Sequence, residues 1–311
     1  RTLEEVLDQR YEDLDPKGPF ALLADTLGAG RDDSRLAEIV LDIARRIQSH
    51  PDPEQWLEEQ KSVWALKGVT DIGRTLWGEL LLEEAKRQAR WCRERLAAAL
   101  ELAGEDELLQ ANYAPSLSAT LDALGDFLAA SAWDEASARM PIPFPPAGRK
   151  RKRAAEVSPM EAERGAEAGE QLKAIRARCK KQLDKAAALV EGDSGELLEE
   201  LALSRPVVEA LMDLTADFLR SYAAEKGRRG VLDFSDLEHM AVRLLLDGEG
   251  RPTPLARSWW DRFDEVLVDE YQDTNQVQNA IFFAVSEEGR RLFQVGDVKQ
   301  SIYRFRLADP T

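Results

Sequence analysis

The sequence predicts a mostly helical α/β protein in which a long helical region is followed by a small piece of parallel sheet. Helices are indicated because apolar residues recur three and four positions apart through the first part of the chain, as they do at Leu36, Ile39, Val40, Ile43 and Ile47. The sheet is indicated by two short apolar runs, at 265–268 and 292–295, that each end abruptly in polar residues. A strand, a crossover helix and a second strand form one right-handed parallel unit.

Composition sets the class of protein. The 311 residues suffice for two domains, and a hydrophobic content of 44% excludes a wholly disordered chain. The net charge of −16 argues against a protein that coats nucleic acid by bulk attraction, although residues 148–185 carry 12 Lys/Arg against 6 Asp/Glu. No apolar run approaches the ~20 residues that a membrane span needs. Cys92 and Cys179 match no metal or redox spacing, so we expect free thiols in a reducing cytoplasm.

The first 147 residues are expected to form a series of helices. Asp52 is predicted to cap one of them, with Pro53 at the first helical position and Gln55 reaching back. Two longer helices are predicted at about 77–102 and 116–133. Residues 140–148 contain four prolines, which force an extended path instead of a helix.

A basic segment follows the prolines. Arg149–Arg153 is a run of five cations, which is either a solvated loop or a contact with DNA phosphates. Ser158 is predicted to open a capping box, and the helix behind it should run to about Val190. This helix carries four cations on neighbouring turns: Lys173, Arg176, Lys180 and Lys181. The next helix is predicted at about 196–226, broken or restarted near Pro206.

The character of the sequence changes after residue 226. We expect a short extended piece at 231–234, a helix to about Leu246 capped by Ser235, and a helix at 276–286 capped by Asn275. Two strands do not make a stable open sheet by themselves. The rest of the sheet is therefore expected to come from outside these 311 residues.

The chemistry is concentrated where the two predicted strands end. Asp269 and Glu270 follow the first strand, where Asp269 would hold Mg²⁺ and Glu270 would accept the proton of an attacking water. After the second strand, Gly296 would permit a close backbone approach, and Gln300 carries an uncharged amide suited to sensing a γ-phosphate. An exposed acidic turn is the competing interpretation, but it leaves the matched second strand unexplained.

Two aromatic residues and a cation come directly after Gln300. Tyr303 and Phe305 are two residues apart, and Arg306 follows them. Aromatic side chains interleaved with cations can stack unpaired bases and neutralise phosphates. Core packing is the alternative for both rings, and their position after a γ-phosphate sensor favours contact with single-stranded DNA.

These motifs resemble those of the superfamily 1 DNA helicases of the UvrD/Rep/PcrA/RecB type. The similarity lies in Asp269–Asp273 and Gln300–Arg306, which resemble motifs II and III, and in the Asp233–His239 segment, where Ser235 departs from the usual acid. Segments at 31–33, 49–53 and 56–57 are similar to the AddA subunits of AddAB helicase–nucleases. Phe305 stands where relatives usually have Trp, which keeps a stacking face, and Leu307 stands where they have Gly.

The resemblance implies a domain organisation. Residues 1–225 would be a helical insertion (domain 1B), with a Pro-rich and basic loop at about 140–158, and residues 226–311 would be part of the first RecA-like domain (1A) of a P-loop NTPase. Gln272, Gln300 and Arg306 would contact the nucleotide, while Tyr303, Phe305 and Arg306 would form the single-strand track.

The resemblance also implies an activity. The parent would be a bacterial, cytoplasmic, ATP- and Mg²⁺-dependent 3′–5′ DNA helicase and exonuclease subunit that acts on single- and double-stranded DNA in double-strand-break repair, with an AddB-like partner. No Gly-x-x-x-x-Gly-Lys-Ser/Thr loop occurs in the sequence, so the 311 residues alone are expected to be inactive as an ATPase.

Two alternatives remain open. The helical region could serve mainly as a binding module that grips duplex DNA or docks an AddB-like partner, through Lys173, Arg176, Lys180 and Lys181. The acids Asp269, Glu270, Asp273 and Asp297 could instead form a metal nuclease, although no basic catalytic residue accompanies them at nuclease spacing.

Overall fold

The computed structural model describes residues 1–28, 33–149 and 158–300, with the side chain of Val298 excepted. The chain divides into two units, each described by itself below. Unit 1 comprises residues 1–64 and 204–311, and unit 2 comprises residues 65–203. The boundary predicted near residue 225 therefore falls inside unit 1. Among the described residues, no helix is long and apolar enough to cross a membrane.

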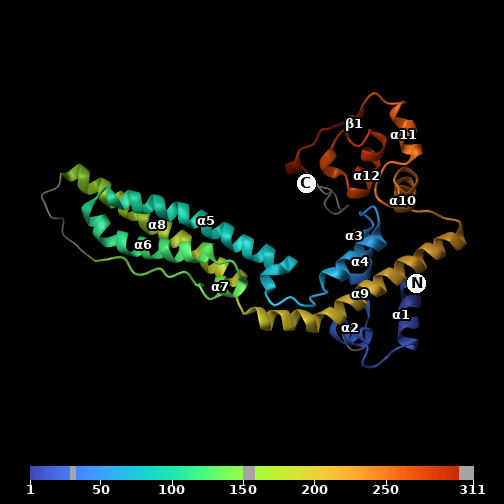
Figure 1. Ribbon diagram of the computed structural model, residues 1–311, viewed down its shortest axis with the longest axis horizontal. Helices are drawn as coiled ribbons and strands as arrows, with labels where there is room; N and C mark the ends of the chain where they lie inside the picture. Colours follow the sequence, from blue (N-terminus) through green and yellow to red (C-terminus); the bar gives the residue numbers. More distant parts are fainter. Residues whose placement is uncertain (29–32, 150–157, 301–311) are drawn as a thin grey trace. The chain divides into compact units, whose positions relative to one another are not determined.

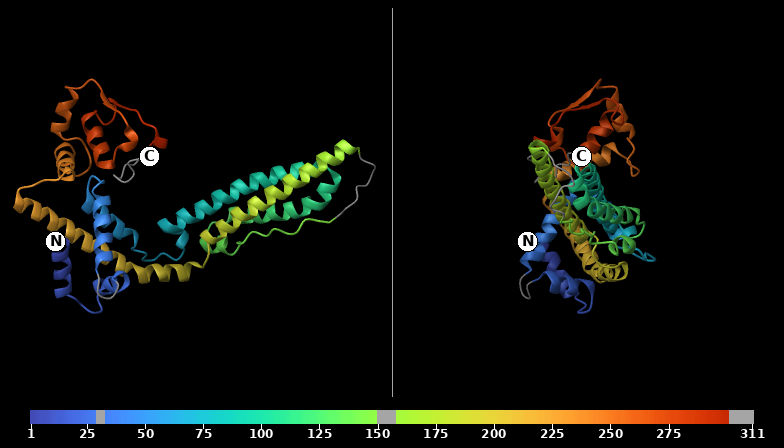
Figure 2. Two further views of the ribbon diagram at one scale, coloured as in Figure 1. Left: turned by 180° about the vertical axis from the view of Figure 1, so that it is seen from behind. Right: turned by 90° about the vertical axis from the view of Figure 1, so that its left-hand side faces the viewer.

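Three long helices build unit 2. They are α5 (Leu76–Gly104), α6 (Glu107–Ala129) and α8 (Pro159–Leu189), and α5 packs against both of the others (Figure 1). The short elements η1 (Ile72–Arg74) and α7 (Trp133–Ser137) and the first turns of α9 (Ser194–Arg229) complete the unit. Leu96, Leu117, Leu124, Phe127 and Leu172 are fully buried between the helices. Figure 2 shows the same side-by-side arrangement from behind.

The helix predicted at 77–102 is confirmed, whereas the next one begins earlier than expected. The side chain of Asp106 accepts hydrogen bonds from the amides of Leu108 and Leu109 and so opens α6 nine residues before Pro115. Pro115 lies inside the helix, and Trp133 belongs to α7. The N-cap, together with the buried apolar face of α6, outweighs the hydrogen bond that a proline removes.

The two cysteines are neighbours in space. Cys92 on α5 and Cys179 on α8 are both fully buried and free. The Cys92 thiol donates to the backbone oxygen of Cys179 at 3.7 Å, and the Cys179 thiol faces the backbone oxygen of Cys92 at 4.0 Å. Small side chains at this crossing let α5 and α8 approach closely, in keeping with the buried alanines 85, 89 and 99.

Residues 140–148 form a strap without helix, as their prolines predict. The Thr120 hydroxyl donates to the Pro143 carbonyl at 2.9 Å, and the Gly148 amide donates to the Asn112 carbonyl at 2.7 Å. Ile142 of the strap is buried in the core of unit 2. The strap is therefore held along α6 before the chain returns through α8, whose predicted capping box at Ser158 and Glu161 is confirmed.

The helix predicted to break near Pro206 is continuous. Asp193 accepts hydrogen bonds from the amides of Gly195 and Glu196, and α9 then runs unbroken from Ser194 to Arg229. Its residues before Leu203 pack in unit 2, and those after Pro206 pack in unit 1. Burial on both sides of Pro206 outweighs the cost of about 3 kcal/mol for an interior proline.

The remaining N-terminal helices belong to unit 1. They are α1 (Thr2–Glu12), α2 (Pro19–Leu27), α3 (Ser34–Ile47) and α4 (Pro53–Val63). Their apolar faces meet the later part of α9, where Leu23, Leu36, Val40 and Leu214 are fully buried. Asp52 caps α4 as predicted, but Gln55 donates to Glu59 instead of reaching back.

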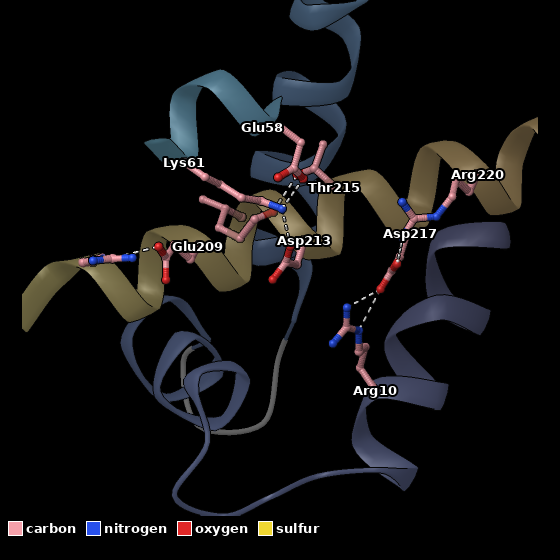
Figure 3. Close-up of polar contacts among 10 residues, drawn as sticks. Arg10, Glu58, Lys61, Glu209, Asp213, Thr215, Asp217 and Arg220 are labelled. Carbon is pink, nitrogen blue, oxygen red and sulfur yellow. Dashed lines mark hydrogen bonds and ion pairs between the residues drawn. The ribbon is translucent and has the colours of Figure 1, made fainter. Parts of the chain in front are cut away.

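Ion pairs join these helices to α9 (Figure 3). Lys61 lies 2.6 Å from both the Glu58 and the Asp213 carboxylates, and Arg10 donates to Asp217, which also contacts Arg220. The Lys61 ammonium is mostly shielded from solvent, with a side-chain exposure of 19%. These contacts fix which faces of α1 and α4 turn toward α9.

The C-terminal part of unit 1 contains α10 (Phe234–Leu245), α11 (Pro254–Trp260), α12 (Gln276–Val285) and a two-stranded sheet. Strands β1 (Val266–Val268) and β2 (Leu292–Gln294) pair in parallel, with Val266 opposite Leu292 and Val268 opposite Gln294. The predicted strand–helix–strand unit is confirmed. So is the cap of α12, where Asn275 and Gln278 form a capping box.

The start of α10 differs from the prediction. Asp233 is the cap, in a capping box with Asp236, and Ser235 lies within the first turn. The Ser235 hydroxyl instead donates to the Gln48 side chain at 2.6 Å. Asp233 is the better cap because its carboxylate also pairs with Lys226 at 2.8 Å.

The loop at residues 48–50 ties the N-terminal helices to this sheet-bearing part. His239 of α10 has its Nε2 2.9 Å from the His50 carbonyl, and its Nδ1 lies 2.8 Å from the Ser235 carbonyl. The Val277 amide in the first turn of α12 donates to the Ser49 carbonyl at 3.0 Å. Residues 1–64 are thereby anchored next to the segment that follows the strand-end acids.

Candidate functional site at the ends of the paired strands

The acids Asp269 and Glu270 lie exposed at the end of β1. Glu270 has a positive φ of 51°, in the left-handed region that residues other than glycine rarely adopt. An oxygen of Asp269 accepts the Glu270 amide at 2.8 Å, which stabilises this turn. Strained backbone of this kind is concentrated at functional sites, because the surroundings must hold it in place.

Gln272 connects the two strand ends. It lies in the short helix η2 (Tyr271–Asp273) and is 3% exposed. Its amide nitrogen donates to the Glu270 carboxylate, and its amide oxygen accepts the Asp297 amide at 2.9 Å. The backbone continues the ladder, because the Tyr271 amide donates to the Val295 carbonyl at 2.8 Å. One buried side chain thus fixes the Glu270 carboxylate relative to the segment after β2.

Gly296 makes this connection possible. A Cβ at position 296 would lie 2.5 Å from the Gln272 amide oxygen and 3.0 Å from the Gln272 backbone nitrogen. Both distances are far below a van der Waals contact, so no other residue fits without moving Gln272. The sequence-based expectation of a close backbone approach at Gly296 is confirmed.

We expect Gly296→Ala to displace Gln272 and release both the Glu270 carboxylate and the Asp297 amide. The measurement is hydrogen exchange of the Asp297 amide in the 311-residue chain, which should speed up in the variant. Gly248→Ala is the matched control, since a Cβ at position 248 meets nothing within 4 Å. Equal exchange at Asp297 in both variants would contradict the clash.

Asp297 and Gln300 continue the polar cluster beyond β2. The Gln300 side chain donates to one Asp297 oxygen at 3.0 Å, and the Lys299 amide donates to the other at 3.0 Å. The hydrogen bond from Gln300, followed by that from Lys299, lowers the pKa of Asp297. Glu270, Gln272, Asp297 and Gln300 therefore form one hydrogen-bonded series along a single edge of the sheet.

The residues fit a nucleotide-bound magnesium ion. Mg²⁺ prefers carboxylate oxygens and is usually held by one or two carboxylates together with substrate phosphates. Among the described residues, neither Asp269 nor Glu270 forms an ion pair with a cation, so both charges are left for such a ligand. The same part of the chain holds no group of three or more His, Cys, Asp or Glu side chains placed to bind a metal. The four-acid nuclease alternative therefore gains no support from the structure.

The predicted DNA-contacting cations lie on α8 of unit 2. Lys173 pairs with Glu170 at 2.6 Å, and Lys180 and Lys181 are exposed without an ion-pair partner in the described part of the chain. Arg176 differs from them, because it donates to the Ser116 hydroxyl at 2.6 Å and to the Pro145 carbonyl at 2.7 Å. Burial lowers the pKa of Arg176. Its guanidinium thus clasps the strap to α6.

The residues predicted to form the single-strand track, Tyr303, Phe305 and Arg306, lie outside the described residues, and their roles stay predictions. Asp297 was considered only for the nuclease alternative, yet it lies at the centre of the polar series. Its position directly after a strand and a glycine was the available signal. Asn279, which accepts a hydrogen bond from the Tyr271 hydroxyl at 3.0 Å, gave no signal in the sequence.

Comparison with known proteins agrees with the motifs. Residues 85–311 match the model of the UvrD/REP helicase N-terminal domain. Bacterial proteins named as the A-type subunits of ATP-dependent helicase/nucleases are similar along the chain: 35% identical over 326 residues in Acetivibrio thermocellus, 35% over 321 in Geobacillus kaustophilus and 34% over 319 in Staphylococcus carnosus. These matches cover 99%, 99% and 100% of the chain and 25% of each relative.

The chain spans about a quarter of the length of the curated relatives it matches. The family match includes β1, β2 and the polar series between their ends, along with most of unit 2. The chain therefore belongs to the UvrD/REP helicase N-terminal domain family.

Proposed function

We propose that the chain is the portion of a longer ATP-dependent DNA helicase–nuclease subunit that supplies the metal-binding and water-activating acids of its motor. The observation that carries this proposal is the polar series from Glu270 through Gln272 and Asp297 to Gln300. A nucleotide motor needs its hydrolytic acids and its γ-phosphate contact at one edge of a sheet, and this series has that arrangement.

Each residue has a role in the proposal. Asp269 binds Mg²⁺, and Glu270 accepts the proton of the attacking water. Gln272 orients the Glu270 carboxylate, and Gln300 contacts the γ-phosphate, so that loss of phosphate changes the hydrogen bonds of Asp297. Bound ATP supplies the phosphoryl group whose hydrolysis drives movement. Arg306 contacts the nucleotide as well, and Tyr303 and Phe305 contact single-stranded DNA.

The proposed parent moves 3′ to 5′ on DNA in the repair of double-strand breaks, with a nuclease domain and an AddB-like partner. The names of the relatives, which describe ATP-dependent helicase/nuclease subunits, support this assignment. In this proposal unit 2 is domain 1B, and the sheet-bearing part of unit 1 is a piece of the first RecA-like domain.

We expect the 311-residue chain alone to hydrolyse no ATP, because it has no Gly-x-x-x-x-Gly-Lys-Ser/Thr loop to bind the β- and γ-phosphates. The longer protein should show ATP hydrolysis that single-stranded DNA stimulates. The measurement is phosphate release by both proteins with and without DNA. DNA-stimulated hydrolysis by the chain alone, or its absence from the longer protein, would contradict the proposal.

The second candidate function is a nucleic-acid-binding role for unit 2 itself. The exposed and unpaired Lys180 and Lys181 of the described α8 favour it, as does the excess of cations in residues 148–185. In this function the strand-end acids would be idle, and binding would not depend on Asp269 or Glu270.

A further inference from the structure

A pocket of about 310 Å³ opens on unit 2 between α6, the strap and α8. Its lining combines aromatic rings, small apolar side chains and cations: Tyr113, Phe144, Ala147, Lys173, Arg176, Ala177 and Lys180. A concave site with apolar walls and a few convergent polar groups is the usual form of a ligand site. The proposed motor does not use this pocket.

The polar groups of the pocket are available for an anion. Lys180 is exposed and has no ion-pair partner in the described ranges, and the Tyr113 hydroxyl makes no hydrogen bond there. Lys173 pairs only with Glu170, and both side chains are more than 60% exposed. Exposed pairs of this kind contribute little and are readily exchanged for another anion.

Arg176 gives the pocket a fixed wall. Its two hydrogen bonds to Ser116 and Pro145 hold the strap, and its guanidinium lies 5.8 Å from the centre of the Phe144 ring. Phe144 is thereby held at the pocket as a half-buried surface. Arg176 is thus a positioning residue for the wall, since its donors already bind protein acceptors.

We propose that this pocket binds one nucleotide of single-stranded DNA, with the phosphate between Lys173, Lys180 and the Tyr113 hydroxyl and the sugar and base against Phe144 and Ala177. An unpaired nucleotide can enter a concave site, whereas duplex DNA presents its phosphates on a convex rod with its bases inside. Cations beside an aromatic wall are the usual combination for unpaired strands. The choice of DNA over other nucleic acids rests on the proposed function.

The surroundings raise the local attraction for a strand. Gly148 is held to Asn112 at the end of the strap, and Arg149 follows it in an exposed position. In sequence, Arg149 begins the run of five cations. A strand leaving the pocket toward this side would therefore meet further positive charge.

The test is binding of a fluorescein-labelled oligodeoxythymidine of about 12 nucleotides to the 311-residue chain, followed by anisotropy without ATP. Lys180→Glu should weaken binding about tenfold or more and reduce the slope of log affinity against log salt by about 0.7 or more. Lys181→Glu is the matched control, because it makes the same charge change on the next residue of α8 and lies outside the pocket lining. It should weaken binding by less than about threefold.

Tyr113→Phe gives a second readout that bulk charge cannot imitate. It keeps the ring and the net charge and removes only the hydroxyl, so binding should weaken about threefold or more. Equal losses in the Lys180 and Lys181 variants, an unchanged affinity in Tyr113→Phe, or effects confined to a duplex of the same length would overturn the proposal. So would an unmodified chain that does not bind the oligonucleotide. Failure of the motor proposal would appear separately, as missing ATP hydrolysis by the longer protein.

Discussion

Glu270→Gln in the longer helicase–nuclease protein should lower the turnover of ATP by about 10²–10⁴-fold, the usual contribution of a general base. The substitution removes the proton acceptor and keeps the shape of the side chain. The amide oxygen of the new residue can still accept the hydrogen bond that Gln272 now donates to the Glu270 carboxylate. The strand ends should therefore keep their geometry while hydrolysis is lost.

Nucleotide binding separates this effect from misfolding. We expect the affinity for ATP with Mg²⁺ to change by less than about threefold, since Asp269 keeps its place at the end of β1. Glu265→Gln is the matched control, because Glu265 is exposed at the opposite end of the same strand. It should leave turnover unchanged. A loss of turnover below about tenfold in Glu270→Gln, or an equal loss in both variants, would reject Glu270 as the base.

Phe127→Ala should destabilise unit 2 by about 3–5 kcal/mol, the usual loss for truncating a fully buried phenylalanine. Phe127 is 0% exposed and lies in the main core cluster of unit 2, together with Leu124 and Trp133. Close-packed helices can fill such a cavity only in part, so the loss combines apolar transfer with the vacated volume.

Phe234→Ala is the control of the same residue type. Phe234 is 87% exposed, so its truncation should change stability by no more than about 0.5 kcal/mol in the 311-residue chain. Hydrogen exchange in urea measures the two units separately, and Phe127→Ala should lower protection in unit 2 alone. A loss below about 1 kcal/mol, or equal losses from both variants, would contradict the assigned core.

The sequence was informative wherever one local signal decided the structure. The parallel pairing of β1 with β2 followed from two apolar runs with a capped helix between them, and the caps at Asp52, Ser158 and Asn275 followed from single side chains near the helix starts. Gly296 was read correctly because only a missing Cβ allows the backbones to approach there.

Sequence reasoning failed where distant packing competes with a local signal. Pro115 and Pro206 were expected to stand outside helices or to break them, yet both lie within helices whose faces are buried on either side. The link from residues 48–50 to α10 and α12 depends on backbone carbonyls of a loop, and a carbonyl has no signature in sequence. Arg176 appeared equivalent to Lys180 on the helix, and only the path of the strap distinguishes them.

The left-handed turn at Glu270 has a consequence for the timing of hydrolysis. Its backbone is set by the Asp269 oxygen, and its side chain is tethered by Gln272, in a chain that holds no nucleotide. The entropy of orienting the proton acceptor is therefore lost once, when the protein folds, and not again in every cycle. Such preorganisation leaves the arrival of the phosphates and the water as the steps that gate each turnover.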